Sequence, residues 1–132
     1  LKLIELSNHN KQSDDLDQIV SDLKVIGFDV VNVKDNRGYL ANYMLFNEIG
    51  GVFKLIELHG YSYESIQVMY GHLYNGRNIF LILDLIGLDV AQSIFENIHE
   101  NDSSVYIPVS LNKAIELGIL GKKNKTSIVD IF

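Results

Sequence analysis

The sequence contains no cysteine, a single proline and few basic residues. Without cysteine there can be no disulfide, cysteine-ligated zinc, iron–sulfur cluster or cysteine nucleophile. Acidic residues outnumber lysine and arginine 17 to 11, which argues against a nucleic-acid surface because phosphate contacts need clustered basic side chains. No apolar run reaches the roughly 18 residues of a membrane-spanning helix. We therefore expect a cytoplasmic protein that contacts neither nucleic acid nor membrane.

The common cofactor motifs are also absent. The sequence has no G-x-G-x-x-G dinucleotide fingerprint. Gly71 and Gly76 have the spacing of a phosphate-binding loop, but Arg77 and Asn78 stand where lysine and serine or threonine belong. The four histidines do not have the spacing of a helical zinc site. We predict no cofactor-binding residue and no metal site within this chain.

The first third of the sequence has the pattern of a strand, a helix and a second strand. Residues 2–6 form an apolar strand-like run, and a β-branched run occupies residues 30–33. Between them, acidic residues follow a capping serine at Ser13, apolar residues recur at helical spacing, and Gly27 is a natural stop. This spacing predicts a parallel βαβ unit. Two parallel strands cannot cover both of their faces, so we expect further strands from elsewhere and a chain cut from a longer protein.

The remaining sequence is helical in pattern. Residues 39–58 form a helix that is apolar around most of its circumference, which predicts a buried central position. Gly50 and Gly51 in its middle need a compensation, either a close helix contact or a kink. Gly60 should end it. Shorter helices are expected at 63–73, 79–86, 89–99 and 110–117, with Asp89 and Ser110 as N-caps of the last two.

Two polar residues interrupt apolar segments. Glu5 lies in the first strand, where a buried carboxylate is costly unless it is paired or functional. Asn42 lies early in the long helix, where a buried amide needs partners. A solvent-facing strand end for Glu5 and a satisfied core or helix-start residue for Asn42 are the structural alternatives. From the pattern alone, both interpretations stay open.

Four segments resemble segments of the 3-hydroxyacyl-CoA dehydrogenase family, in the same order and with agreeing spacings. Residues 1–6, LKLIEL, resemble the strand M-K-L-V-E-V of that family. Residues 34–42, KDNRGYLAN, resemble K-D-x-P-G-F-x-x-N, and residues 83–89, LDLIGLD, resemble a D-x-x-G-L-D helix junction. Residues 110–111 and 120–123 resemble S-x-x-L followed by G-[RK]-K. Four such segments in order are more specific than any one of them.

The resemblance implies a mainly α fold with two parts. Residues 1–35 would be the βαβ end of a Rossmann-like NAD-binding domain, and residues 36–132 an all-helical, 6-phosphogluconate-dehydrogenase-like domain that binds substrate and dimerises. Glu5 matches the glutamate that pairs with a catalytic histidine, and Asn42 matches the asparagine that polarises the substrate. The implied function is NAD-dependent oxidation of 3-hydroxyacyl-CoA in fatty-acid metabolism.

The resemblance also implies partners. These are an acyl-CoA thioester, a missing domain that binds NAD, and a second copy of the chain. The catalytic histidine belongs upstream of Leu1, so we expect the isolated chain to be inactive. Arg37 replaces the family's proline, Tyr43 replaces an arginine, and residues 75–78 and 125–129 depart from the family's turn and C-terminal patterns. A related hydroxyacid or sugar-acid dehydrogenase domain and a non-catalytic helical interaction module remain alternatives.

Overall fold

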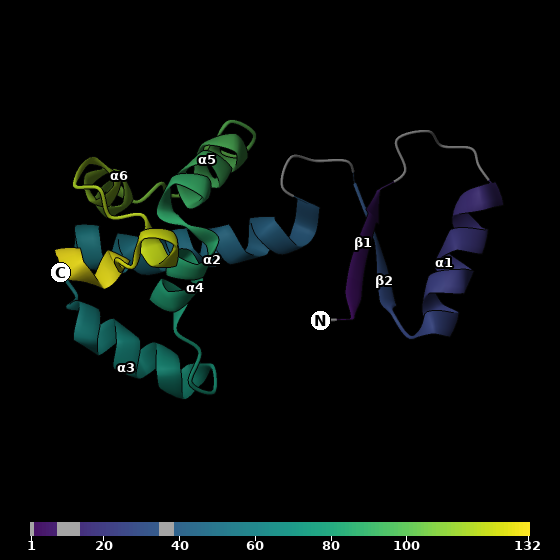
Figure 1. Ribbon diagram of the computed structural model, residues 1–132, viewed down its shortest axis with the longest axis horizontal. Coiled ribbons are helices and arrows are strands. Elements are labelled where there is room, and N and C mark those ends of the chain that lie inside the picture. The colour runs from purple at the N-terminus through teal and green to yellow at the C-terminus, as the bar shows by residue number, and fades with distance from the viewer. Residues whose placement is uncertain (1, 8–13, 35–38) are drawn as a thin grey trace. The chain divides into compact units, whose positions relative to one another are not determined.

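The computed structural model describes residues 2–7, 14–34 and 39–132 (Figure 1). The chain divides into two compact units, Leu1–Met44 and Leu45–Phe132. The predicted domain boundary between residues 35 and 36 lies outside the described residues, so the division into 1–35 and 36–132 stays a prediction. The turn predicted at residues 36–38 and the cap predicted at Ser13 also lie outside them.

The first unit contains a parallel βαβ arrangement. Strand β1 (Leu3–Ser7) pairs in parallel with β2 (Asp29–Val33), and helix α1 (Asp14–Ile26) connects them and contacts β2 (Figure 1). Gly27 follows α1 at φ 96°, a left-handed conformation that ends a helix without the strain a side chain would cause. The predicted parallel crossover is therefore confirmed.

The described residues of this unit form no core of their own. None of them is buried, and several apolar side chains of α1 and β1 are open to solvent. Val25 is 85% exposed, Ile26 70%, Ile19 47% and Leu3 42%. A two-stranded parallel sheet with one helix leaves apolar faces uncovered, because parallel sheets normally have helices on both faces.

Helix α2 (Tyr39–His59) leads from the first unit into the second. Its middle is buried, with Phe46, Ile49 and Phe53 fully inaccessible to solvent. Its ends are not, since Met44 is 63% and Leu58 60% exposed. The expectation of a helix buried on most sides is therefore correct for the middle and wrong for the ends. The helix ends directly before Gly60, as predicted, and Gly60 has φ 72°.

The second unit is a helical bundle closed by two short 3-10 segments. Its elements after α2 are α3 (Tyr63–Leu73), α4 (Ile79–Ile86), α5 (Leu88–His99), α6 (Val109–Glu116), η1 (Gly121–Asn124) and η2 (Ile128–Ile131) (Figure 1). Aromatic rings pack edge to face in its core, with 4.9 Å between the centroids of Phe46 and Phe95 and 5.6 Å between those of Phe53 and Phe80. The predicted mainly α fold is confirmed.

Two predicted helix caps are wrong. Gly87, not Asp89, is the N-cap of α5, and Asp89 lies within the first turn. Pro108 is the N-cap of α6, and Ser110 lies inside that helix. At α6, Glu57 accepts from the N–H groups that a cap side chain would have used, whereas at α5 the Asp89 carboxylate pairs with Lys123.

Candidate functional site

Glu5 lies in the middle of β1, opposite Val31 of β2. Side chains alternate along a strand, so Glu5 points to the same side of the sheet as Leu3. Its side chain is half-buried, and its Oε1 accepts a hydrogen bond from the backbone N–H of Ala41 at 2.8 Å. No other described residue donates a hydrogen bond to Glu5. One oxygen of the carboxylate is thus fixed, and the other has no partner within the described part of the chain.

The donor of this hydrogen bond lies in the first turn of α2. The first N–H groups of a helix have no partner within the helix, and a carboxylate there is favoured by the positive end of the helix dipole. Tyr39 begins the helix at φ 50°, and Asn42 follows Ala41 directly. The structure therefore brings Glu5 to the helical turn that carries Asn42, although 36 residues separate Glu5 from Ala41. The Asn42 side chain is exposed, so it is not a buried core amide.

A second carboxylate, Glu57 of α2, holds the start of α6. It accepts hydrogen bonds from the backbone N–H groups of Val109 and Ser110, at 3.0 and 2.7 Å, and from the hydroxyls of Ser110 and Tyr106. Burial alone would raise the pKa of Glu57, but these four hydrogen bonds together lower its pKa below the ordinary value. Glu57 is therefore a saturated structural acceptor and not a free acid or base.

The segment resembling the D-x-x-G-L-D junction anchors the C-terminal part of the chain. Asp84 is 5% exposed and accepts from the backbone N–H of Ile128 at 2.8 Å and from the hydroxyl of Ser127. A Cβ on Gly121 would lie 2.5 Å from the backbone oxygen of Asp84, so glycine is required for this close approach. Asp84 therefore serves the docking of η1 and η2 on α4.

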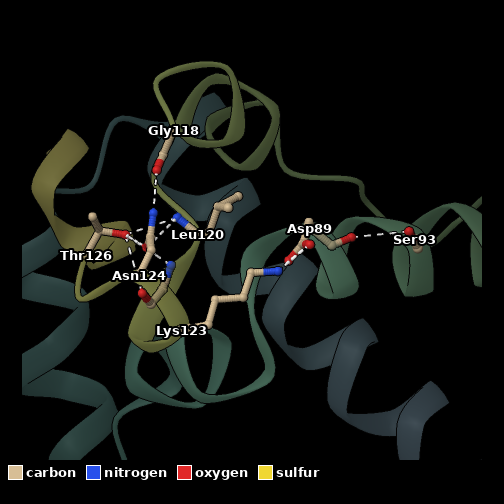
Figure 2. A network of polar contacts seen from close by, with 8 residues as sticks. Asp89, Ser93, Gly118, Leu120, Lys123, Asn124 and Thr126 are labelled. Atoms are coloured by element: carbon tan, nitrogen blue, oxygen red, sulfur yellow. Dashed lines mark hydrogen bonds and ion pairs between the residues drawn. The ribbon is translucent and has the colours of Figure 1, made fainter.

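A polar network joins α5 to the loop around η1 (Figure 2). Lys123 forms an ion pair with Asp89, which holds the pKa of that carboxyl below its usual value. Asn124 donates to the carbonyl of Gly118 at 2.7 Å, and Thr126 accepts from the backbone N–H of Leu120 at 3.0 Å (Figure 2). Of the basic residues near the C-terminus, Lys123 thus links the η1 segment to α5. The other contacts of the network are hydrogen bonds within the chain.

The described residues contain no group of three or more histidine, aspartate or glutamate side chains that could hold a metal ion. Over the same residues, no helix is long and apolar enough to cross a membrane. The remaining candidate for chemistry is the pair predicted from the sequence, Glu5 and Asn42, which the α2 N-terminus brings to one region of the first unit.

Comparison with known proteins gives a consistent result for the fold. No protein-family model and no curated protein sequence matches the chain. Among solved structures, the (S)-3-hydroxybutyryl-CoA dehydrogenase PaaH1 from Ralstonia eutropha matches with a TM-score of 0.85 and 22% identity, over 97% of this chain and 47% of that one. The chain has the fold of 3-hydroxyacyl-CoA dehydrogenases.

Two further structures agree. FadB2 from M. tuberculosis matches with a TM-score of 0.84 and 22% identity, over 97% of this chain and 47% of its own. The 3-hydroxybutyryl-CoA dehydrogenase from Escherichia coli K12 matches with a TM-score of 0.79 and 18% identity, over 96% of this chain and 28% of its own. The predicted resemblance is confirmed at the level of the fold. The chain spans about half the length of PaaH1 and of FadB2, and 28% of the Escherichia coli protein.

The structure adds three groups that the sequence did not indicate: the main-chain N–H of Ala41, Glu57 and Asp84. Glu57 could have been predicted as a carboxylate in an apolar helix, as Glu5 was in an apolar strand. Asp84 lies within a segment that resembles the family, but the pattern gives it no role. The Ala41 N–H could not have been predicted, because a backbone donor does not affect the side-chain pattern.

Proposed function

We propose that this chain is the C-terminal portion of an NAD-dependent 3-hydroxyacyl-CoA dehydrogenase of fatty-acid metabolism, acting on 3-hydroxybutyryl-CoA or a similar thioester. The supporting observation is the agreement of fold over 97% of the chain, combined with four sequence segments in the family's order. The placement of Glu5 beside the turn that carries Asn42 supports the same proposal, because both positions match functional residues in the resemblance.

In this proposal Glu5 and Asn42 have different roles. The Glu5 carboxylate accepts a hydrogen bond from a histidine supplied by another part of the protein, orients the imidazole and stabilises its charged form. The histidine takes the proton of the substrate's 3-hydroxyl. Asn42 donates a hydrogen bond near the reacting oxygen and so stabilises the charge that develops there. NAD, bound by a dinucleotide-binding domain outside this chain, supplies the hydride acceptor.

The uncovered faces of the first unit are consistent with such a domain. Leu3 and Val31 lie on the side of the sheet that carries Glu5, and both are exposed, at 42% and 38%. Further parallel strands beside β1 and β2 would extend the sheet, as a doubly wound nucleotide-binding fold requires. In this proposal, residues of β1 and β2 complete the sheet that binds NAD.

An activity assay tests the proposal. The isolated chain should show no NADH oxidation with acetoacetyl-CoA, whereas the protein that joins this chain to its dinucleotide-binding portion should turn over. In that longer protein, Glu5→Gln should keep the fold and the KM for acetoacetyl-CoA but lower kcat by about 100-fold, the usual scale of general acid–base effects. Glu64→Gln, an exposed glutamate on α3, is the matched control and should leave kcat unchanged.

Turnover by the isolated chain would refute the need for a histidine from outside it. Normal kcat in the Glu5→Gln variant would leave Glu5 with a purely structural role. Loss of activity in Glu64→Gln as well would show that the assay reports general damage and not the chemistry of Glu5.

We also propose that the helical unit self-associates. Helix α3 exposes Val68, Met69 and Leu73 at 60 to 70%, and α4 exposes Leu85 at 62%. Clusters of exposed apolar side chains are typical of partner surfaces, Val68, Met69 and Leu73 follow one another closely on α3, and a two-fold dimer is the commonest assembly. Light scattering should give a mass about twice the 14.9 kDa of the chain. A single-chain mass at tens of micromolar would contradict this.

A further inference from the structure

We infer that the main-chain N–H of Ala41 is a positioning group for the reaction: it fixes Glu5 so that the second carboxylate oxygen faces the histidine. The inference rests on the proposed function and deepens it. It assigns a role to the hydrogen bond that joins β1 to the start of α2 in the first unit. It also explains how a residue on a strand and a residue on a helix can serve the same reaction, one through the histidine and the other at the substrate.

The geometry of Glu5 suits this role. A glutamate side chain has three rotatable bonds, and an unheld carboxylate on a half-buried strand would sample several rotamers. The Ala41 N–H holds Oε1 at 2.8 Å, while Oε2 receives no hydrogen bond from any residue in the described ranges. A carboxylate with one fixed and one unoccupied oxygen is arranged to orient an imidazole, because the donor on one side defines the direction of the acceptor on the other.

The position of the donor couples Glu5 to Asn42. Ala41 directly precedes Asn42 in the first turn of α2, so the Ala41 N–H and the Asn42 Cα belong to the same helical turn. A shift of the helix start would displace the orienting carboxylate and the amide that polarises the substrate at the same time. The alternative is a purely structural cap, in which Glu5 satisfies a free N–H of the helix and does nothing further.

Removing only this N–H separates the two roles. In the longer protein that contains the dinucleotide-binding portion, Ala41→Pro deletes the donor, and proline is tolerated in the first turn of a helix. Leu40→Pro is the control, because it places the same ring in the same turn and keeps the Ala41 N–H. Ala41→Pro should lower kcat by about tenfold to a hundredfold with an unchanged KM for acetoacetyl-CoA, the range expected for one lost hydrogen bond to a charged group. Leu40→Pro should retain kcat.

A double-mutant cycle identifies the pathway of the effect. In a Glu5→Ala background, Ala41→Pro should cause no further loss of kcat, because the group on which it acts is gone. If Ala41→Pro does not fold, an ester bond in place of the amide at position 41 removes the same hydrogen and keeps the alanine side chain. The ester variant should show the same loss and the same absence of effect in the Glu5→Ala background.

The outcomes distinguish the inference from the proposed function. Wild-type kcat in a folded Ala41→Pro or ester variant, or an additive loss in the Glu5→Ala background, overturns the inference while leaving the function of Glu5 intact. A wild-type protein that does not oxidise NADH with acetoacetyl-CoA, or a Glu5→Ala variant as active as wild type, overturns both.

Discussion

The two units of this chain differ in how they bury apolar surface. All of the buried residues that the structure describes lie in Leu45–Phe132, where aromatic and aliphatic side chains of α2, α4, α5 and α6 fill a common core. No described residue of Leu1–Met44 is buried, although the sequence of this unit is also rich in valine, leucine and isoleucine. A similar hydrophobic content therefore gives a closed core in one region and an open surface in the other.

The same difference appears in the two glutamates that bond to distant backbone groups. Glu57 in the second unit accepts four hydrogen bonds, all from residues of its own unit. From the described residues, Glu5 in the first unit accepts one. Buried polar groups that stabilise a fold normally have all of their hydrogen-bond partners within it. A carboxylate oxygen without a partner can accept a hydrogen bond from another group. Within the described residues, the second unit buries a core and satisfies Glu57, whereas the first unit leaves apolar side chains and one oxygen of Glu5 without such partners.

The largest expected effect is in a matched pair of leucines. Leu83→Ala in the fully buried core of α4 should lower the free energy of unfolding by about 2–5 kcal/mol, through lost burial and the cavity left behind. Leu3→Ala in the first unit, where Leu3 is 42% exposed, should cost less than about 1 kcal/mol. Urea unfolding followed by helical circular dichroism measures both.

Similar losses of stability in the two leucine variants of this chain would mean that the two units do not differ in burial. Leu3→Ala is then repeated in the longer protein. There, new strands or helices covering the sheet should raise the cost of the same substitution above its value in the isolated chain.

Much of the fold follows from the sequence because local signals and burial agree. The bounds of α3 and α4 match the predicted ranges 63–73 and 79–86, where caps, turns and apolar spacing point to the same residues. The caps at Asp89 and Ser110 were wrong because both side chains have alternative partners, Lys123 and Glu57, that lie 34 and 53 residues away. Local sequence preferences for a cap cannot predict a partner that only the tertiary fold brings close to the side chain.

The candidate site was predictable only in its side chains. Glu5 and Asn42 stand out as polar residues in apolar segments, and the resemblance gives them roles. Their arrangement depends on the Ala41 N–H, a group that every non-proline residue carries. No sequence pattern distinguishes the one backbone donor that meets a carboxylate from the many that do not.

A smaller effect is expected at the two adjacent glycines of α2. A Cβ on Gly50 would lie 2.5 Å from the backbone oxygen of Tyr106, whereas a Cβ on Gly51 would meet nothing within 4 Å. Gly50→Ala should therefore destabilise the chain by about 1–3 kcal/mol through overpacking. Gly51→Ala should stabilise it by about 0.5–1 kcal/mol, since alanine is the better helix former.

The glycine pair tests how closely the second unit is packed, and thermal or urea unfolding of both variants at one pH is sufficient. The expected compensations were a close helix contact or a kink, and the structure instead places the loop backbone at Tyr106 against Gly50. Equal effects of the two substitutions would mean that Tyr106 does not approach α2 this closely and that the second unit is packed less tightly at this point.

The smallest effect concerns Glu57, the hydrogen-bonded glutamate of the second unit, and depends on pH. Glu57→Gln places an amide N–H₂ against N–H and O–H donors and should lower the free energy of unfolding at pH 7 by about 1 kcal/mol. The pKa of Glu57 is lower in the folded chain than its ordinary value of 4.5. Its stabilising contribution is therefore fully present above about pH 4.5 and is lost as the pH falls through the lower folded value. Urea unfolding from pH 7 to pH 3 should show the wild type and Glu57→Gln converging at the acid end. A constant gap between wild type and Glu57→Gln would show that the charge of Glu57 does not carry its effect.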